Sequence, residues 1–222
     1  MICAHMSMID AVEFIYPDWP APSNVRCLST TRLGGVSTAP YQGNNLALHV
    51  GDKPENVQQN RARLAALGAL PGEPAWLGQT HTNHVVHCES EDYHADGRYA
   101  DRSHQVCVVM TADCLPVLIC DKAGSQVAAI HAGWRGLANN ILENGVALFR
   151  GSRADLMVWL GPAIGKQAFE VGQEVYGVFV KQYPGVAVFF EPTQWGKYFM
   201  DIYGLATLLL NKAGIRAVYG GE

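Results

Sequence analysis

Short apolar runs separated by polar or glycine-containing breaks recur along most of the chain. The runs are rich in Val, Ile and aromatic residues, and Gly, Pro or Asp residues border them. Segments of this kind are typical of β-strands. The pattern predicts eight strands, at 26–32, 84–89, 105–112, 115–121, 126–131, 156–161, 186–191 and 216–220.

Four other segments carry apolar residues at helical spacing or between clear start and stop signals. The first has Asp52 as its expected N-cap, Pro54 in its first turn and Gly68 as its stop signal. The other three helices are expected at 137–149, 171–183 and 201–214. Strands outnumber helices and do not alternate with them, so the predicted fold class is α+β with mixed sheets rather than a doubly wound fold.

The chain has no fixed-period repeat, no low-complexity segment and no Pro/Ser-rich linker. We therefore expect one domain over residues 9–222, a length that can bury a substantial core. The first eight residues contain three methionines, and we interpret them as a remnant of cloning outside the domain.

The strands at 115–121 and 126–131 flank a four-residue polar break that contains a glycine, which predicts a hairpin. A symmetric turn places Pro116 opposite His131. Cys114 lies two positions before Pro116 and shares its face, because side chains alternate along a strand. Diagonal neighbours across a hairpin lie about 7–8 Å apart. Cys114 and His131 are therefore expected on one face, unless the register slips by one residue.

The surroundings of the two residues suit a reactive site. Cys114 follows Asp113 at a break in the chain, and His131 precedes a Gly-flanked turn that carries Arg135 at the expected start of a helix. Such a turn can direct backbone N–H groups and a guanidinium at an anion. The alternative is that Cys114 and His131 are ordinary core residues. Cys107 and Cys120, inside apolar runs, are interpreted as core residues.

A third group is needed for a metal site. The segment "WLGQTHTNHVVH" offers His81, His84 and His87, and spacing alone does not select among them. One Cys with two His would match the three-ligand pattern of catalytic zinc, which leaves a fourth position open.

Composition narrows the classes of function. The formal net charge is −4 and no Lys/Arg-rich run occurs, so a nucleic-acid partner is not expected. No apolar stretch has the length of a membrane span, and the N-terminus lacks the features of a signal peptide. Six scattered cysteines without a C-x-x-C pair indicate reduced thiols in the cytoplasm.

Several motifs together resemble the YfiH-like laccase-domain family, whose members are also called multicopper polyphenol oxidases. They occur in family order along nearly the whole chain. The matching segments are "TTRLGGVSTAPY", "NNLALHVGD", "NR", "WLGQTH", "TADCLPVLICD", "AAIHAGWRG" and "WLGPAIGKQAFEVGQEV".

The resemblance implies a layered α/β sandwich and one zinc ion per chain held by His81, Cys114 and His131. It also implies phosphorolysis of adenosine, inosine, guanosine and methylthioadenosine, and deamination of adenosine. Asn45 and Arg61 match motif positions expected to contact substrate.

Two features depart from the family pattern. Thr82 replaces the usual Gly after the metal histidine, and the domain is expected to lack a family tail of the form "C-T…S-Y-R-R-D…T-G-R".

Four functions follow from these residues. The first is a zinc-dependent nucleoside enzyme, in which Asp113 donates a proton and Arg61 or Arg135 holds phosphate. The second is a copper enzyme that oxidises phenols, although the H-x-H pairs of multicopper oxidases are absent from the eight histidines. The third is a metal-free hydrolase with Cys114 as nucleophile and His131 as base. The fourth is a metal-binding protein without enzymatic activity.

Overall fold

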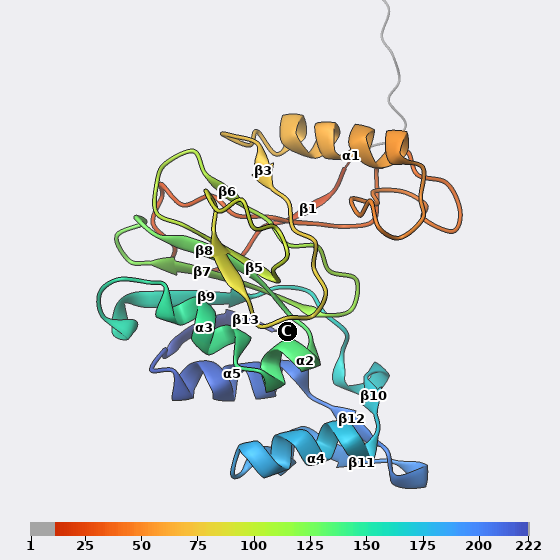
Figure 1. The fold of residues 1–222 in the computed structure, drawn as a ribbon, viewed down its shortest axis with the longest axis vertical. Helices are drawn as coiled ribbons and strands as arrows, with labels where there is room; N and C mark the ends of the chain where they lie inside the picture. Colours follow the sequence, from red (N-terminus) through yellow and green to blue (C-terminus); the bar gives the residue numbers. More distant parts are fainter. Residues whose placement is uncertain (1–11, 222) are drawn as a thin grey trace, which may run out of the picture. The chain divides into compact units, whose positions relative to one another are not determined.

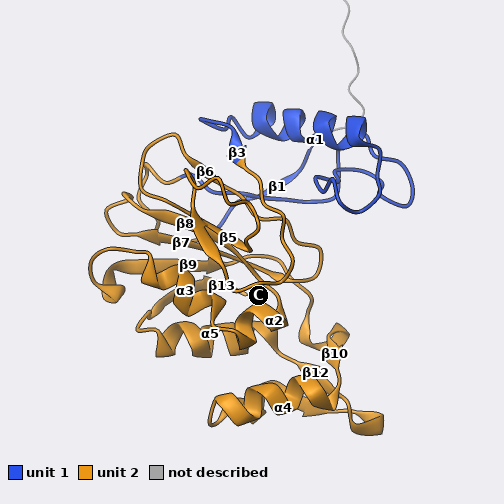
Figure 2. Cartoon of the chain, in the orientation of Figure 1, with its two compact units in different colours: residues 1–17, 26–74 blue, residues 18–25, 75–222 orange. Residues whose placement is uncertain are grey.

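The computed structural model describes residues 12–221, so the proposed cloning remnant lies outside the described residues. The chain divides into two compact units (Figure 2). The first comprises residues 1–17 and 26–74, and the second comprises residues 18–25 and 75–222. The expectation of a single domain over 9–222 stays a prediction, because two compact units can belong to one domain.

Within its described residues, the first unit holds one helix and one pair of short strands. Strand β1 (Phe14–Ile15) pairs antiparallel with β2 (Ser29–Thr30), which is all that forms of the strand expected at 26–32. Helix α1 (Pro54–Leu67) begins with Pro54 and is capped at its C-terminus by Gly68, as expected. The N-cap prediction was wrong, because Lys53 occupies that position. The Asp52 carboxylate instead accepts hydrogen bonds from Ser37 and Asn45.

A six-stranded mixed sheet forms the centre of the second unit (Figure 1). Its order is β13-β9-β7-β8-β5-β4, with parallel pairs only at the two edges, β13 with β9 and β4 with β5. The predicted mixed α+β fold is confirmed. The strands are β4 (Val85–His87), β5 (Gly97–Ala100), β7 (Leu115–Asp121), β8 (Val127–Ala132), β9 (Leu156–Leu160) and β13 (Ala217–Gly220).

Helices α2 (Trp134–Ala138), α3 (Ile141–Ala147) and α5 (Ile202–Lys212) lie along one side of this sheet (Figure 1). Their apolar faces and the sheet form one continuous core, in which the largest fully buried side chains include Leu115, Ile119, Ile130, Leu137, Ile141, Leu142, Leu156, Ile202, Leu205 and Leu209. Asp201 caps α5 by accepting the Gly204 N–H. None of the helices within residues 12–221 is long and apolar enough to cross a membrane.

The helix predicted at 137–149 is two helices. Asn140 takes a left-handed conformation with φ of 66°, which ends α2 and starts α3 in a new direction. Asparagine tolerates this conformation better than most residues. The side chain of Asn140 also accepts a hydrogen bond from the Tyr183 hydroxyl at 2.7 Å, which fixes the break.

A smaller three-stranded sheet packs with α4 (Gln173–Gln182) near the C-terminal part of the second unit. Its order is β10 (Glu170–Val171), β12 (Tyr198–Met200) and β11 (Phe190–Pro192). The strand predicted at 186–191 was largely wrong, because Val186–Phe189 forms a 3-10 turn. The remaining strands are β3 (Pro74–Ala75) and β6 (Val106–Cys107); the latter is much shorter than the predicted strand 105–112.

Candidate metal centre

Three side chains from distant parts of the second unit converge at one end of the central sheet. His81 lies in the loop before β4, Cys114 immediately before β7, and His131 within β8. Their ligand atoms all lie within 4.8 Å of one another. The three residues could therefore hold a metal ion.

The hairpin of β7 and β8 brings Cys114 and His131 together. Pro116 pairs with His131, and the Asp121 N–H donates to the Gln126 carbonyl at 3.2 Å across the turn. The register predicted from the symmetric break is therefore confirmed. Nearly every side chain of the two strands is buried, so a slip of one residue would move each side chain into the packing of the opposite face.

His81 reaches the other two residues from a strained loop. Its backbone has φ of 62°, a left-handed conformation that non-glycine residues adopt rarely. The Asp96 carboxylate holds this loop by accepting the backbone N–H groups of His81 at 3.0 Å and Thr82 at 2.6 Å. The Thr82 hydroxyl donates to the same carboxylate at 2.7 Å. Thr82 thus adds a hydrogen bond to the loop that Gly, the residue expected here from the family pattern, could not form.

Asp96 also orients His131, a role that no sequence motif indicated. The Asp96 carboxylate lies 2.7 Å from Nδ1 of His131, and its backbone carbonyl accepts the His131 N–H at 2.7 Å. With Nδ1 engaged, Nε2 is the nitrogen that faces the candidate site. A carboxylate behind a metal-binding histidine fixes the ring and raises its basicity. Asp96 is fully buried, a position that an acidic residue occupies only when it is well paired.

Hydrogen bonds shift the pKa values of Asp96 and His131 further than burial does, and in the opposite direction. Burial alone would raise the pKa of Asp96, but the bonds from His131 and Thr82 lower it to about 2. Burial alone would lower the pKa of His131, but Asp96 and Cys114 raise it to about 9. The pKa of His81 is lowered by burial and by the neighbouring His131 charge.

One of the donor-atom separations matches that of a tetrahedral ion. Cys114 Sγ lies 3.7 Å from His81 Nε2. A tetrahedral zinc ion with ordinary bond lengths places a sulfur and a nitrogen ligand about 3.6 Å apart. Gly133 lies directly against the group: a Cβ there would approach His81 Cδ2 to 2.8 Å and Cys114 Sγ to 3.1 Å. The backbone therefore leaves room for this ligand set only because residue 133 has no side chain.

The other two histidines of the "HTNHVVH" segment do not join the group. His84 is exposed, and His87 Nε2 lies 3.0 Å from the Asp101 carboxylate on the far side of β4 from this loop. Asp113 is exposed beside Cys114, and its carbonyl accepts the Ile164 N–H at 2.9 Å. Arg135 is exposed at the start of α2, with its guanidinium 4.4 Å from the Trp134 ring centre.

Asn45 and Arg61 belong to the first unit, and both are tied to its backbone. The Asn45 amide donates to Asp52 at 2.9 Å and accepts the Ala47 N–H at 3.0 Å. Arg61 Nε donates to the Leu46 carbonyl at 2.9 Å. Their expected role as substrate contacts stays a prediction.

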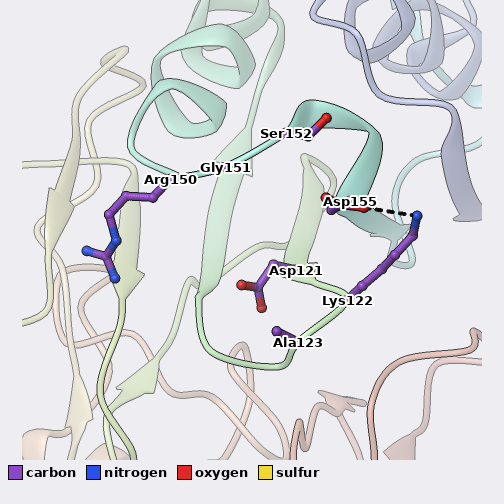
Figure 3. Close-up of a pocket in the computed structure, with 7 residues that line it drawn as sticks. All are labelled: Asp121, Lys122, Ala123, Arg150, Gly151, Ser152 and Asp155. Carbon is purple, nitrogen blue, oxygen red and sulfur yellow. Dashed lines mark hydrogen bonds and ion pairs between the residues drawn. The ribbon is translucent and has the colours of Figure 1, made fainter.

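A pocket of about 440 Å³ lies at the opposite end of β7 (Figure 3). Asp121 in its wall is seven residues from Cys114, which corresponds to roughly 23 Å along a strand. Both of its cations are already paired, Lys122 with Asp155 and Arg150 with Asp101. The pocket is lined by Asp121, Lys122, Ala123, Arg150, Gly151, Ser152 and Asp155. Its chemistry is unrelated to the candidate metal centre.

Comparison with known proteins identifies the family. The model of the multi-copper polyphenol oxidoreductase laccase family matches residues 26–222, and the chain belongs to this family. It is 46% identical over 214 residues to the purine nucleoside phosphorylase YfiH of Escherichia coli, covering 95% of this chain and 87% of that protein. It is 44% identical over 215 residues to a purine nucleoside phosphorylase of Haemophilus influenzae, covering 95% and 88%.

Solved structures of similar proteins have the same fold. The crystal structure of Neisseria meningitidis protein NMB0706 superposes with a TM-score of 0.90 at 47% identity, covering 94% of this chain and 87% of that one. YlmD of Geobacillus stearothermophilus gives a TM-score of 0.79 at 29% identity, covering 87% and 79%. The predicted YfiH-like fold is thereby confirmed.

Proposed function

We propose that this chain is a zinc-dependent purine nucleoside phosphorylase. One observation carries the proposal: the ligand atoms of His81, Cys114 and His131 lie within 4.8 Å of one another in a chain 46% identical to a protein named purine nucleoside phosphorylase. A thiolate and two imidazoles suit zinc, and three protein ligands leave a fourth position open. When bound, the ion supplies Lewis acidity at that position.

In phosphorolysis, a phosphate oxygen attacks C1′ of the ribose, the bond from C1′ to the purine breaks, and the purine takes up a proton. Arg135 is the cation of the second unit proposed to hold the phosphate, since its guanidinium is exposed and its stacking on Trp134 limits its orientations. Asp113, exposed beside Cys114, is the proposed proton donor. Asn45 and Arg61 are proposed to contact the nucleoside.

The proposed substrates are adenosine, inosine, guanosine and methylthioadenosine, and the proposed setting is the cytoplasm. We also propose a second reaction at the same site, deamination of adenosine, in which water replaces the amino group at C6 and ammonia leaves. Asp96 supports both reactions by keeping His131 and the His81 loop in place.

The test combines metal analysis with product analysis. Protein purified without added metal is analysed for its metal content and then incubated with adenosine, with and without phosphate. About one zinc per chain, with adenine formed only when phosphate is present, supports the phosphorylase. Inosine formed without phosphate supports the deaminase. Substitution of the exposed His84 by Ala provides a control that should change neither result.

Oxidation of phenols with copper is a second candidate, favoured by the name of the matching family. A thiolate with two imidazoles binds Cu²⁺ tightly as well as Zn²⁺. Within residues 12–221, however, a single group of three or more potential ligands is found, which suits one ion. Several copper ions per chain, and phenol oxidation faster than adenosine turnover, would favour this candidate.

A metal-free hydrolase is the third candidate, favoured by the order Cys114, His131 and Asp96 across the site. A cysteine, a histidine and an orienting carboxylate form the arrangement of an activated nucleophile. Full activity after removal of metal by a chelator would favour the hydrolase and contradict the zinc enzyme.

A further inference from the structure

Two other cysteines of the second unit face each other away from the candidate metal centre. Cys88 follows β4 directly, and Cys107 lies in β6. Their sulfur atoms are 3.4 Å apart, and both residues are partly buried. Cys107 was expected to be an ordinary core residue, so its approach to a second thiol is a property that its apolar neighbours in the sequence do not indicate.

The pair is separate from His81, Cys114 and His131. Cys107 Sγ lies 4.0 Å from the carbonyl oxygen of Val127, at the first residue of β8. His131 is four residues further along that strand, roughly 13 Å away. Chemistry at Cys88 and Cys107 therefore does not require a change in the ligand group.

A buried cation borders the two thiols. Arg98 in β5 is only 4% exposed, and its guanidinium donates to the carbonyls of His87 and Ser90, the residues on either side of the Cys88 segment. Its Nε has no hydrogen-bond partner. Among the described residues, no carboxylate forms an ion pair with Arg98, so its charge is left to act on the nearby sulfurs.

The two thiols are not equivalent. The hydrogen bond with Cys107 lowers the pKa of Cys88 despite partial burial, and the Arg98 charge lowers it further. The hydrogen bond to Cys88 and burial raise the pKa of Cys107 well above its usual value. Cys88 is therefore the sulfur that loses its proton more readily, and the thiolate is the form that reacts with oxidants.

We propose that Cys88 and Cys107 are a peroxide-sensitive thiol pair that closes to a disulfide. In the first step, the Cys88 sulfur attacks the O–O bond of a hydroperoxide, which releases an alcohol, or water from hydrogen peroxide, and leaves Cys88 as a sulfenic acid. In the second step, the Cys107 sulfur attacks the Cys88 sulfur, forms the S–S bond and releases water. Two thiols are oxidised and one peroxide is reduced.

The test uses the full chain loaded with zinc, so that the candidate metal ligands are protected. The protein is treated with hydrogen peroxide, remaining thiols are alkylated, and the chain is cut after Lys/Arg and before Asp. Cys88 then lies alone in fragment 64–91, and Cys107 lies alone in fragment 103–112, apart from Cys114 and Cys120. Mass spectrometry should find these two fragments linked, with equal loss of alkylation at Cys88 and Cys107.

Variants separate the two steps. Cys107→Ser should leave a Cys88 sulfenic acid that dimedone traps, whereas Cys88→Ser should leave Cys107 fully alkylated. Cys27→Ser is the control and should retain the linked fragments. In urea, the link should be lost, because the proposal depends on the folded geometry.

Three results would overturn the proposal. The first is full alkylation of both fragments at peroxide concentrations that oxidise glutathione. The second is further oxidation of Cys88 while Cys107 remains alkylated. The third is a link that forms equally well in urea.

Discussion

Nδ1 of His131 lies 2.7 Å from the carboxylate of Asp96, and the same carboxylate accepts the backbone N–H of His81. Asp96 is not one of the three proposed metal ligands, but it contacts two of the residues that are. Replacing Asp96 by Asn removes the charge behind His131 and places an NH₂ group against backbone donors. We expect metal affinity to fall roughly 10- to 100-fold, the usual effect of losing such a partner. Competition with a chromophoric chelator measures the affinity, and circular dichroism checks the fold.

Thr82→Ser is the matched control for that variant, since it keeps the hydroxyl that donates to Asp96. It should bind metal as the wild type does. Equal affinity of Asp96→Asn and the wild type would show that the carboxylate has no part in metal binding.

The ligand set itself is tested by removal of single donors. Cys114→Ala and His81→Ala should each lose the ion while keeping most of the fold, because both side chains lie outside the fully buried core. His84→Ala, three residues from His81 and exposed, should keep one ion per chain. Metal analysis after gel filtration measures the stoichiometry. Metal retained in Cys114→Ala would exclude the proposed ligand set.

Gly133→Ala tests the space around the ligands without removing any of them. The new methyl group would lie 2.8 Å from His81 Cδ2 and 3.1 Å from Cys114 Sγ, so one ligand must move. Overpacking costs about 1–3 kcal/mol, which corresponds to a roughly 5- to 150-fold loss of metal affinity.

Gly165→Ala is the control, because a Cβ there meets nothing within 4 Å and the backbone has an ordinary φ of −70°. Competition with a chelator should show weaker metal binding in Gly133→Ala and unchanged metal binding in Gly165→Ala. Unchanged affinity in Gly133→Ala would mean that the ligands have more freedom than their packing indicates.

The lowered pKa of Asp101 predicts that the free energy of unfolding depends on pH. Asp101 follows β5, at the end of the central sheet away from the candidate metal centre. Hydrogen bonds from Arg150 and His87 lower its pKa from 3.8 to about 2. The stabilisation by Asp101 is therefore complete above about pH 4 and is lost as the pH falls through 2. Urea unfolding at several pH values should show a shallower acid loss for Asp101→Asn than for the wild type. Parallel curves for the two proteins would contradict this role.

The sequence predicted the hairpin because its determinants are local. The polar break, the apolar strands and the alternation of faces all lie within 115–131. Counting residues outward from the centre of the turn was therefore enough to pair Pro116 with His131. The same rules failed at Asn140, where a left-handed residue divides a segment with continuous helical spacing.

His81 could not be selected from spacing, because its position depends on a distant residue. The loop is held by Asp96, which precedes β5, and β5 is the short and partly polar segment "GRYA" that no strand signal marks. Without that strand, nothing in the sequence distinguishes His81 from His84. The family resemblance supplied the choice, and the geometry of Asp96 gives a physical reason for it.

The pairing of β7 with β8 has a consequence for folding fidelity. A slip of one residue would leave most of the strand hydrogen bonds intact but would separate Cys114 and His131 on opposite faces. An ion that binds both residues stabilises only the correctly paired sheet, by an amount set by its concentration relative to its dissociation constant. Metal binding at His81, Cys114 and His131 would thus select the correct strand pairing over the slipped one.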